Sequence, residues 1–162
     1  MVTPMITSPI PFEAVCPKEA LDFPWVVFLD DTQDPFSSLT QLVDFYCPTC
    51  DCHRTWLVLI DLSGRPKLSI AYGWKDQDFY QENGFDKKNA ALLTQGFLDP
   101  LGHQSEDSEA LFPKIIKIIK ADKDRLNHRY ELFRKTLAKN PSKYLNKKNI
   151  HNSYNVIRFS KS

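Results

Sequence analysis

Residues 54–74 constrain the fold more than any other part of the chain, because they predict two strands joined by a tight turn. Apolar side chains recur at every second position in both halves, which are TWLVLIDL and KLSIAYGW. The intervening SGRP combines a glycine and a proline, which are typical turn residues. A period of two on either side of a turn predicts a β-hairpin.

Residues 105–140 predict two consecutive helices. Acidic side chains gather near the start, at Glu106, Asp107 and Glu109, where the helix dipole favours negative charge. Apolar residues then recur at helical spacing on both sides of a break expected near residues 121–122. They are Ile115, Ile116, Ile118 and Ile119 before the break, and Leu126, Tyr130, Phe133 and Leu137 after it.

These segments predict an α+β fold, in which a small antiparallel sheet is built on the hairpin and the C-terminal helices pack on one of its faces. A short strand is expected within residues 24–31, and a short helix capped by Asp76. Residues 34–46 fit either a helix or a strand that leads into the cysteines. We expect one domain over residues 1–140 and a basic polar tail over residues 141–162.

The charge of the chain is strongly segregated although the total is only +1. Residues 1–112 contain 7 Lys and Arg against 17 Asp and Glu, a net charge of −10. Residues 113–162 contain 14 against 3, a net charge of +11. This asymmetry predicts that the basic part contacts the acidic body or an acidic partner. Because the acidic body repels a phosphate backbone, we expect a protein partner rather than a nucleic acid held by Lys143, Lys147 and Lys148.

Nothing in the sequence predicts contact with a membrane. The longest apolar run, TWLVLIDL, is interrupted by Asp61 and is too short to span a bilayer. The first residues lack the basic patch and apolar core of a signal peptide. We therefore expect a cytoplasmic protein, and in a reducing compartment clustered cysteines favour metal or redox chemistry over structural disulfides.

Cys47, Cys50 and Cys52 form a C-x-x-C-x-C cluster that we interpret as a zinc site. Two thiolates two residues apart can bind one tetrahedral ion, and soft sulfur ligands favour zinc or iron–sulfur clusters over magnesium or calcium. A thioredoxin-like dithiol at Cys-Pro-Thr-Cys is a second interpretation. It is weakened because the following residues predict a strand, whereas a helix N-terminus would activate the thiol. Three free cysteines without a role are the third interpretation.

Four residues are candidates for the fourth metal ligand. Cys16 is the only other thiol, so we rank it first; His128 and His103 follow, and His53 is strained as a ligand beside Cys52. If water held the fourth position the site would suit a metal-dependent hydrolase, with Asp51 as the nearest carboxylate. No other acid–base constellation accompanies the cysteines, so we favour a non-catalytic binding or scaffold module.

Several motifs together resemble a widespread family of uncharacterised bacterial proteins. The motifs are YCPTCDC, IAYGW, DFY, LDPLGHQSEDSEALF and RLNHRYELFR, and the resemblance covers roughly residues 44–136. The resemblance implies that Cys47, Cys50 and Cys52 form the shared core of a metal site. It implies no established activity.

Two other charged groups are better explained as solvated surface. Asp30, Asp31 and Asp34 follow a predicted strand and favour an exposed turn over a cation site. Lysines at positions 114, 117 and 120 share one side of a helix, and we expect them to face solvent.

Overall fold

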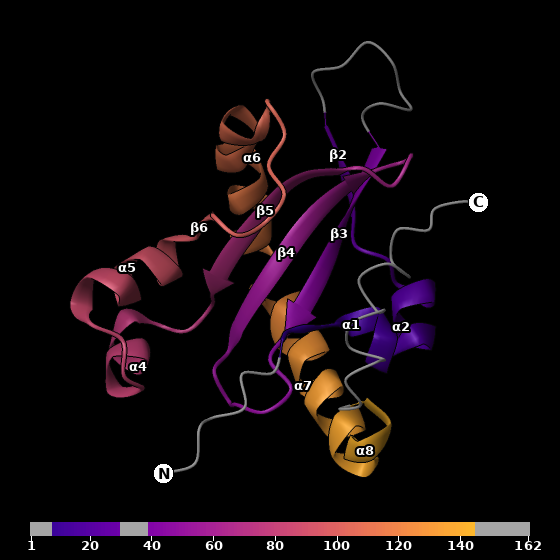
Figure 1. Ribbon diagram of the computed structural model, residues 1–162, viewed down its shortest axis with the longest axis vertical. Coiled ribbons are helices and arrows are strands. Elements are labelled where there is room, and N and C mark those ends of the chain that lie inside the picture. The colour runs from indigo at the N-terminus through magenta and orange to yellow at the C-terminus, as the bar shows by residue number, and fades with distance from the viewer. Residues whose placement is uncertain (1–7, 30–38, 145–162) are drawn as a thin grey trace.

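The structure of the protein, a computed structural model, describes residues 8–29 and 39–144. These residues form an open antiparallel sheet with helices packed around it (Figure 1), which confirms the α+β prediction. The strands are β1 (Ile10–Pro11), β2 (Val26–Phe28), β3 (Leu39–Tyr46), β4 (Arg54–Asp61), β5 (Pro66–Gly73) and β6 (Phe97–Leu98). The helices are α1 (Phe12–Val15), α2 (Pro17–Asp22), α4 (Gln77–Glu82), α5 (Lys87–Gln95), α6 (Ser108–Ala121), α7 (Lys123–Lys139) and α8 (Pro141–Tyr144).

The predicted hairpin is present as β4 and β5, which form the centre of the sheet (Figure 1). Its turn is held by the Asp61 side chain, whose Oδ1 accepts hydrogen bonds from the backbone N–H of Ser63 at 2.9 Å and of Arg65 at 3.0 Å. Gly64 has a φ of 83°, a left-handed conformation that suits glycine. The turn residues therefore explain why the chain reverses here.

The ambiguous segment before the cysteines is a strand. β3 pairs with β4 from Thr40 opposite Asp61 to Tyr46 opposite Thr55, and β1 and β2 pair with its other edge. The sheet order is β1-β3-β4-β5-β6, with β2 also bonded to β3. Because β3 ends at Tyr46 and β4 begins at Arg54, the cysteines occupy the connection between two central strands.

The two C-terminal helices supply the main hydrophobic core, as predicted. α6 and α7 are separated at Asp122, and their apolar side chains pack with one face of the sheet. Fully buried members of this core include Leu57, Leu59, Leu68, Ile70, Ile115, Ile119, Leu126 and Phe133. The short helix α4 is also present, and its first turn is capped by Asp76, whose Oδ1 accepts from Phe79 N at 2.8 Å.

A buried ion pair fixes α7 against β3. Arg129 Nε lies 2.7 Å from Asp44 Oδ2, and Arg129 Nη2 lies 2.9 Å from Asp44 Oδ1. The Tyr46 hydroxyl donates to the same carboxylate at 2.6 Å. The side chains of Arg129 and Asp44 are only 6% and 1% exposed, so both charges are removed from water and depend on each other.

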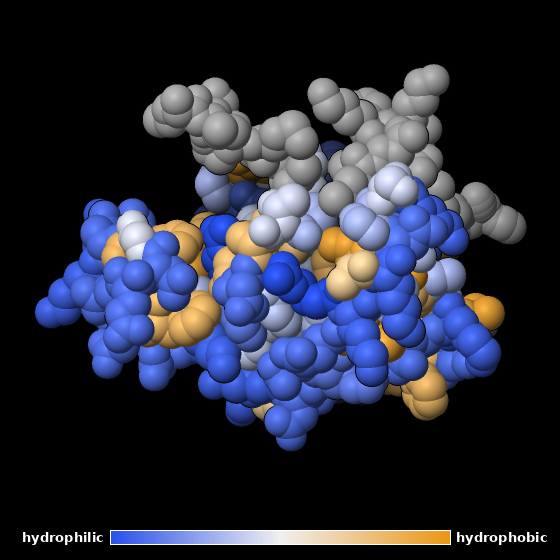
Figure 2. Space-filling model, turned by 90° about the horizontal axis from the view of Figure 1, so that it is seen from below, coloured by the Kyte–Doolittle hydropathy of each residue, from blue (hydrophilic) through white to orange (hydrophobic). Residues whose placement is uncertain are grey.

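The face shown in Figure 2 is largely hydrophilic with scattered hydrophobic side chains. Among residues 8–29 and 39–144, no helix is both long and apolar enough to cross a membrane. The acidic group at residues 30–34 and the tail from residue 145 onward lie outside the described residues. The interpretations of those two segments therefore stay predictions.

Candidate metal centre

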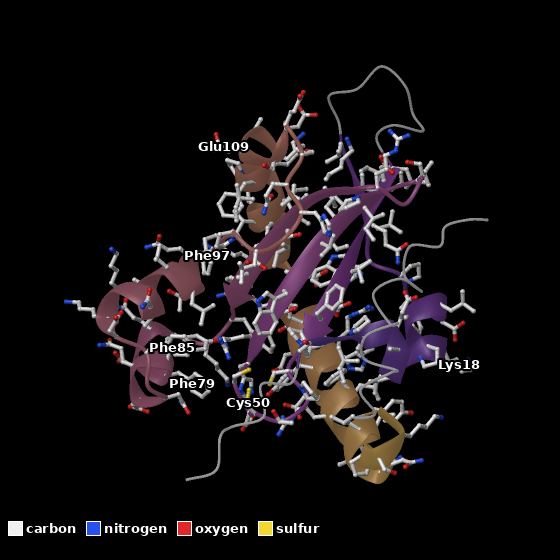
Figure 3. The ribbon with its side chains drawn as sticks, viewed as in Figure 1. Lys18, Cys50, Phe79, Phe85, Phe97 and Glu109 are labelled. Carbon is white, nitrogen blue, oxygen red and sulfur yellow. The ribbon has the colours of Figure 1, made fainter. Side chains whose placement is uncertain are left out.

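The three clustered cysteines come together in the connection between β3 and β4, which we call the cysteine loop (residues 47–53). Figure 3 shows Cys50 at the end of the sheet where this loop lies. The Sγ atoms of Cys47, Cys50 and Cys52 all lie within 4.8 Å of one another, and those of Cys47 and Cys50 are 2.9 Å apart. All three thiols are free and partly exposed. They form a group that can hold a metal ion.

The thiols strongly perturb one another's ionisation. Hydrogen bonds, first with Cys52 and then with Cys50, lower the pKa of Cys47 to about 4. The hydrogen bond with Cys47 is the main cause that raises the pKa of Cys52. Burial, followed by the Cys47 hydrogen bond, raises the pKa of Cys50. The three-thiol group therefore favours one thiolate and disfavours the ionisation of the other two thiols. A bound cation would remove that opposition, because thiolate is the form that binds metal.

Arg54 places a positive charge beside the cysteine loop. Burial is the largest single influence and opposes the charge of its guanidinium, but the hydrogen bonds and charges of Cys52 and Cys50 together raise the Arg54 pKa. The guanidinium also lies over the rings of Trp56 and Phe85, at 5.3 Å and 5.1 Å from their centroids. A divalent ion with three thiolates carries a net charge of −1, which Arg54 is placed to offset.

Helix α7 holds the cysteine loop from one side. The Tyr130 hydroxyl donates to Asp51 Oδ1 at 3.0 Å and lies 3.4 Å from the Cys50 carbonyl oxygen. Arg134 Nη1 donates to the same Cys50 oxygen. Two side chains one helical turn apart therefore form hydrogen bonds with adjacent residues of the loop. These hydrogen bonds connect the cysteine loop to α7, and the Asp44–Arg129 ion pair holds α7 against β3.

The end of the loop is held from the other side through His53. Its carbonyl oxygen accepts hydrogen bonds from the Tyr80 hydroxyl at 2.5 Å and from Trp74 N at 3.4 Å. Its ring packs against those of Trp74, Phe79 and Tyr130, with centroids 5.7, 5.4 and 4.7 Å away. The φ of His53 is 48°, in the left-handed region that is uncommon outside glycine. The surrounding aromatic side chains hold this conformation in place.

The structure does not bring His53 into the three-thiol group. Its Nδ1 lies 3.4 Å from Asp51 Oδ1, close enough for an ion-pair contact but without the geometry of a hydrogen bond. Nδ1 of His53, Nε of Arg54 and Nε1 of Trp74 are buried nitrogens for which the described part of the chain provides no hydrogen-bond partner. His53, Arg54 and Trp74 therefore each contribute a buried nitrogen atom near the cysteine loop.

The other predicted candidates for the fourth ligand also lie outside the group formed by the three cysteines. Cys16 is buried, and its thiol contacts the Thr136 hydroxyl on α7 at 3.6 Å. His128 lies on an exposed part of α7, with Nε2 3.4 Å from Glu19 Oε2. His103 follows β6 in a loop bonded to β5. The fourth ligand stays a prediction, and three thiols are what the described residues assemble.

The sequence does not predict the residues that support the loop. Tyr130 and Arg134 both belong to the motif RLNHRYELFR, and Tyr130 is expected on the apolar face of its helix, but neither is expected to contact the cysteines. The signal for them was their spacing of four residues, which places both side chains on one side of a helix. No sequence signal shows that this side of α7 meets the cysteine loop, because the two segments are about 80 positions apart.

Comparisons with protein-family models, with curated proteins and with solved structures find no match to the chain. The family resemblance over residues 44–136 therefore stays a hypothesis that rests on its motifs.

Proposed function

We propose that the protein is a zinc-binding module in which Cys47, Cys50 and Cys52 hold a structural zinc ion. The observation that carries this proposal is the grouping of three Sγ atoms within 4.8 Å of one another. Three thiolates favour zinc over the hard cations magnesium and calcium, which prefer oxygen ligands. The role of the ion would be to fix the connection between the two central strands β3 and β4.

The surroundings of the thiols support a structural role rather than catalysis. A metal-dependent hydrolase needs a polar cleft and a carboxylate free to move protons. Asp51, the nearest carboxylate in sequence, accepts a hydrogen bond from Tyr130. One surface hollow is lined by α7 residues from His128 to Lys135, and another lies over β3 and β4. Neither of these two hollows is lined by a cysteine. Because Asp51 is engaged by Tyr130, we rank the hydrolase behind a binding or scaffold module.

A thioredoxin-like dithiol oxidoreductase is a further alternative. Enzymes of that kind place the reactive cysteine at a helix N-terminus, which stabilises its thiolate. Here the cysteine loop leads into strand β4 and the sheet around it is antiparallel. We therefore rank this alternative lowest.

A protein partner in a reducing compartment such as the cytoplasm is part of the proposal. The clustered free thiols support the reducing compartment, because metal-binding thiols must stay reduced. The opposite charges of residues 1–112 and 113–162 support a contact with protein rather than with nucleic acid. A titration of oligonucleotides into the full chain at several salt concentrations tests that ranking. Steeply salt-dependent binding that disappears on truncation after Asn140 would reverse it.

Metal analysis of the chain purified under reducing conditions tests the zinc proposal. We expect about one zinc per chain, and loss of the ion in each of Cys47→Ser, Cys50→Ser and Cys52→Ser. A strong chelator should lower the melting temperature, because the binding energy of a structural zinc is also folding energy. Thr49→Ser is the matched control in the same loop and should keep the zinc. A chain that carries no metal, with intact reduced cysteines, would refute the proposal.

Cys16→Ser tests the predicted fourth ligand separately. If Cys16 completes the site, this variant loses zinc as the three loop variants do. If it does not, zinc content stays at one per chain.

A further inference from the structure

We propose that Cys47 and Cys50 form an oxidation site through which a peroxide releases the metal. The inference rests on the proposed zinc site and adds a means of regulating it. Its basis is the 2.9 Å separation of the two Sγ atoms, in a group whose three Sγ atoms all lie within 4.8 Å of one another. Both thiols are partly exposed, so a small oxidant in solution can reach them.

The sequence spacing favours a disulfide between Cys47 and Cys50 over one between Cys50 and Cys52. Two residues separate Cys47 from Cys50, a spacing that allows a disulfide within one turn of chain. Only Asp51 separates Cys50 from Cys52, and a disulfide across a single residue strains the backbone and the S–S geometry. When Cys47 and Cys50 are joined, Cys52 is the one remaining thiol of the group, and one thiolate is too few to hold the ion.

The chemistry balances with hydrogen peroxide as the two-electron oxidant. One of the two thiolates attacks the peroxide O–O bond, forming a sulfenic acid and releasing hydroxide, which takes a proton from solvent to become water. The second thiolate attacks the sulfenic sulfur, so the S–S bond forms and a second hydroxide leaves as water. The two sulfurs lose two electrons and peroxide gains them. The zinc ion leaves with its charge unchanged.

The supports of the cysteine loop favour the disulfide over further oxidation. Tyr130 and Arg134 hold Asp51 and the Cys50 carbonyl without using the thiols. Those contacts remain when the metal leaves, so the two sulfurs stay close together. A resolving thiol held nearby reacts with the sulfenic acid as an intramolecular neighbour, before a second peroxide molecule arrives.

The test is a peroxide titration of the zinc-loaded full chain. Zinc release is followed with a chromogenic chelator, and disulfides are located by mass mapping of peptides under non-reducing conditions. We expect one zinc released for each disulfide formed, with the bond joining Cys47 to Cys50. Adding a dithiol reductant and zinc should restore the loaded chain.

Two matched variants locate the reactive pair. Cys52→Ser should still form the disulfide when treated with peroxide. Cys50→Ser should form no disulfide within the loop, and its Cys47 should instead be trapped by a sulfenic-acid reagent. A bond that includes Cys52, or oxidation to sulfinic acid without any disulfide, would overturn the inference.

Failure of this inference is distinguishable from failure of the zinc proposal. A chain that binds one zinc but keeps it through stoichiometric peroxide refutes the oxidation site and leaves the zinc site standing. A chain that never binds zinc refutes both.

Discussion

Replacement of Arg129 by methionine should destabilise the protein strongly, because it leaves the Asp44 carboxylate buried without its counterion. Arg129 donates two hydrogen bonds to that carboxylate, at 2.7 and 2.9 Å. A third donor, Nη1, lies 3.2 Å from the Phe23 carbonyl oxygen. The guanidinium also lies over the Phe12 ring, 4.0 Å from its centroid. The variant loses all of these contacts, and within residues 8–29 and 39–144 the Tyr46 hydroxyl is the hydrogen-bond donor that Asp44 keeps.

The expected cost follows from the burial of the pair. Asp44 is 1% exposed, so water cannot replace the lost partner. Breaking a buried ion pair on one side typically costs about 3–5 kcal/mol. Arg125→Met is the matched control on the same helix, since Arg125 pairs with Asp122 at 2.9 Å while both side chains are more than a third exposed. An exposed pair of that kind contributes at most about 1 kcal/mol.

Urea unfolding followed by far-UV circular dichroism measures both variants. With a slope of about 2 kcal/mol/M, the Arg129→Met midpoint should fall by about 2 M. The double variant Asp44→Leu/Arg129→Met removes the stranded charge, so it should be at least about 1 kcal/mol more stable than Arg129→Met alone. If Arg129→Met costs no more than Arg125→Met, the assignment of this pair as the anchor of α7 is refuted.

Three further predictions concern other parts of the fold. Arg134→Met removes a hydrogen bond to the cysteine-loop backbone. Zinc affinity, measured by competition with a chelator, should therefore fall about 10-fold or more, as it does when other residues that position metal ligands are replaced. Unchanged affinity would contradict that role. Gly73→Ala should destabilise the chain by about 1–3 kcal/mol, because the added methyl group would collide with the Tyr80 hydroxyl and with Leu93 Cγ. A melting temperature equal to that of wild type would show that the site has room for the methyl group. Burial raises the pKa of Tyr72 from 10.0 to about 12, so the stability that depends on its protonated hydroxyl is present below pH 10 and is lost as the pH rises towards 12. Tyr72→Phe should lose less stability over that range in urea titrations, and an equal loss would assign the effect to other groups.

Interactions between neighbouring residues are enough to predict the local elements and to identify the three thiols. The alternation in residues 54–74 predicts strands, and SGRP supplies the residues that a tight turn requires. The helical spacing of apolar residues in α6 and α7 is equally local, as is the cap at Asp76. The three cysteines lie within six consecutive positions, so their proximity needs no knowledge of the fold.

Features that join distant segments of the chain follow from the packed fold and not from local sequence. Residues 39–46 have a sequence that suits helix or strand, and pairing with β4 selects the strand because its backbone groups find partners there. Asp44 and Arg129 are 85 positions apart, and neither residue indicates the other in the sequence. The sequence also does not indicate that Tyr130 and Arg134 contact the cysteine loop, or that Cys16 lies apart from the three-thiol group. Local patterns report the energies of neighbouring residues, whereas these contacts exist only after the chain has packed α7 against the sheet.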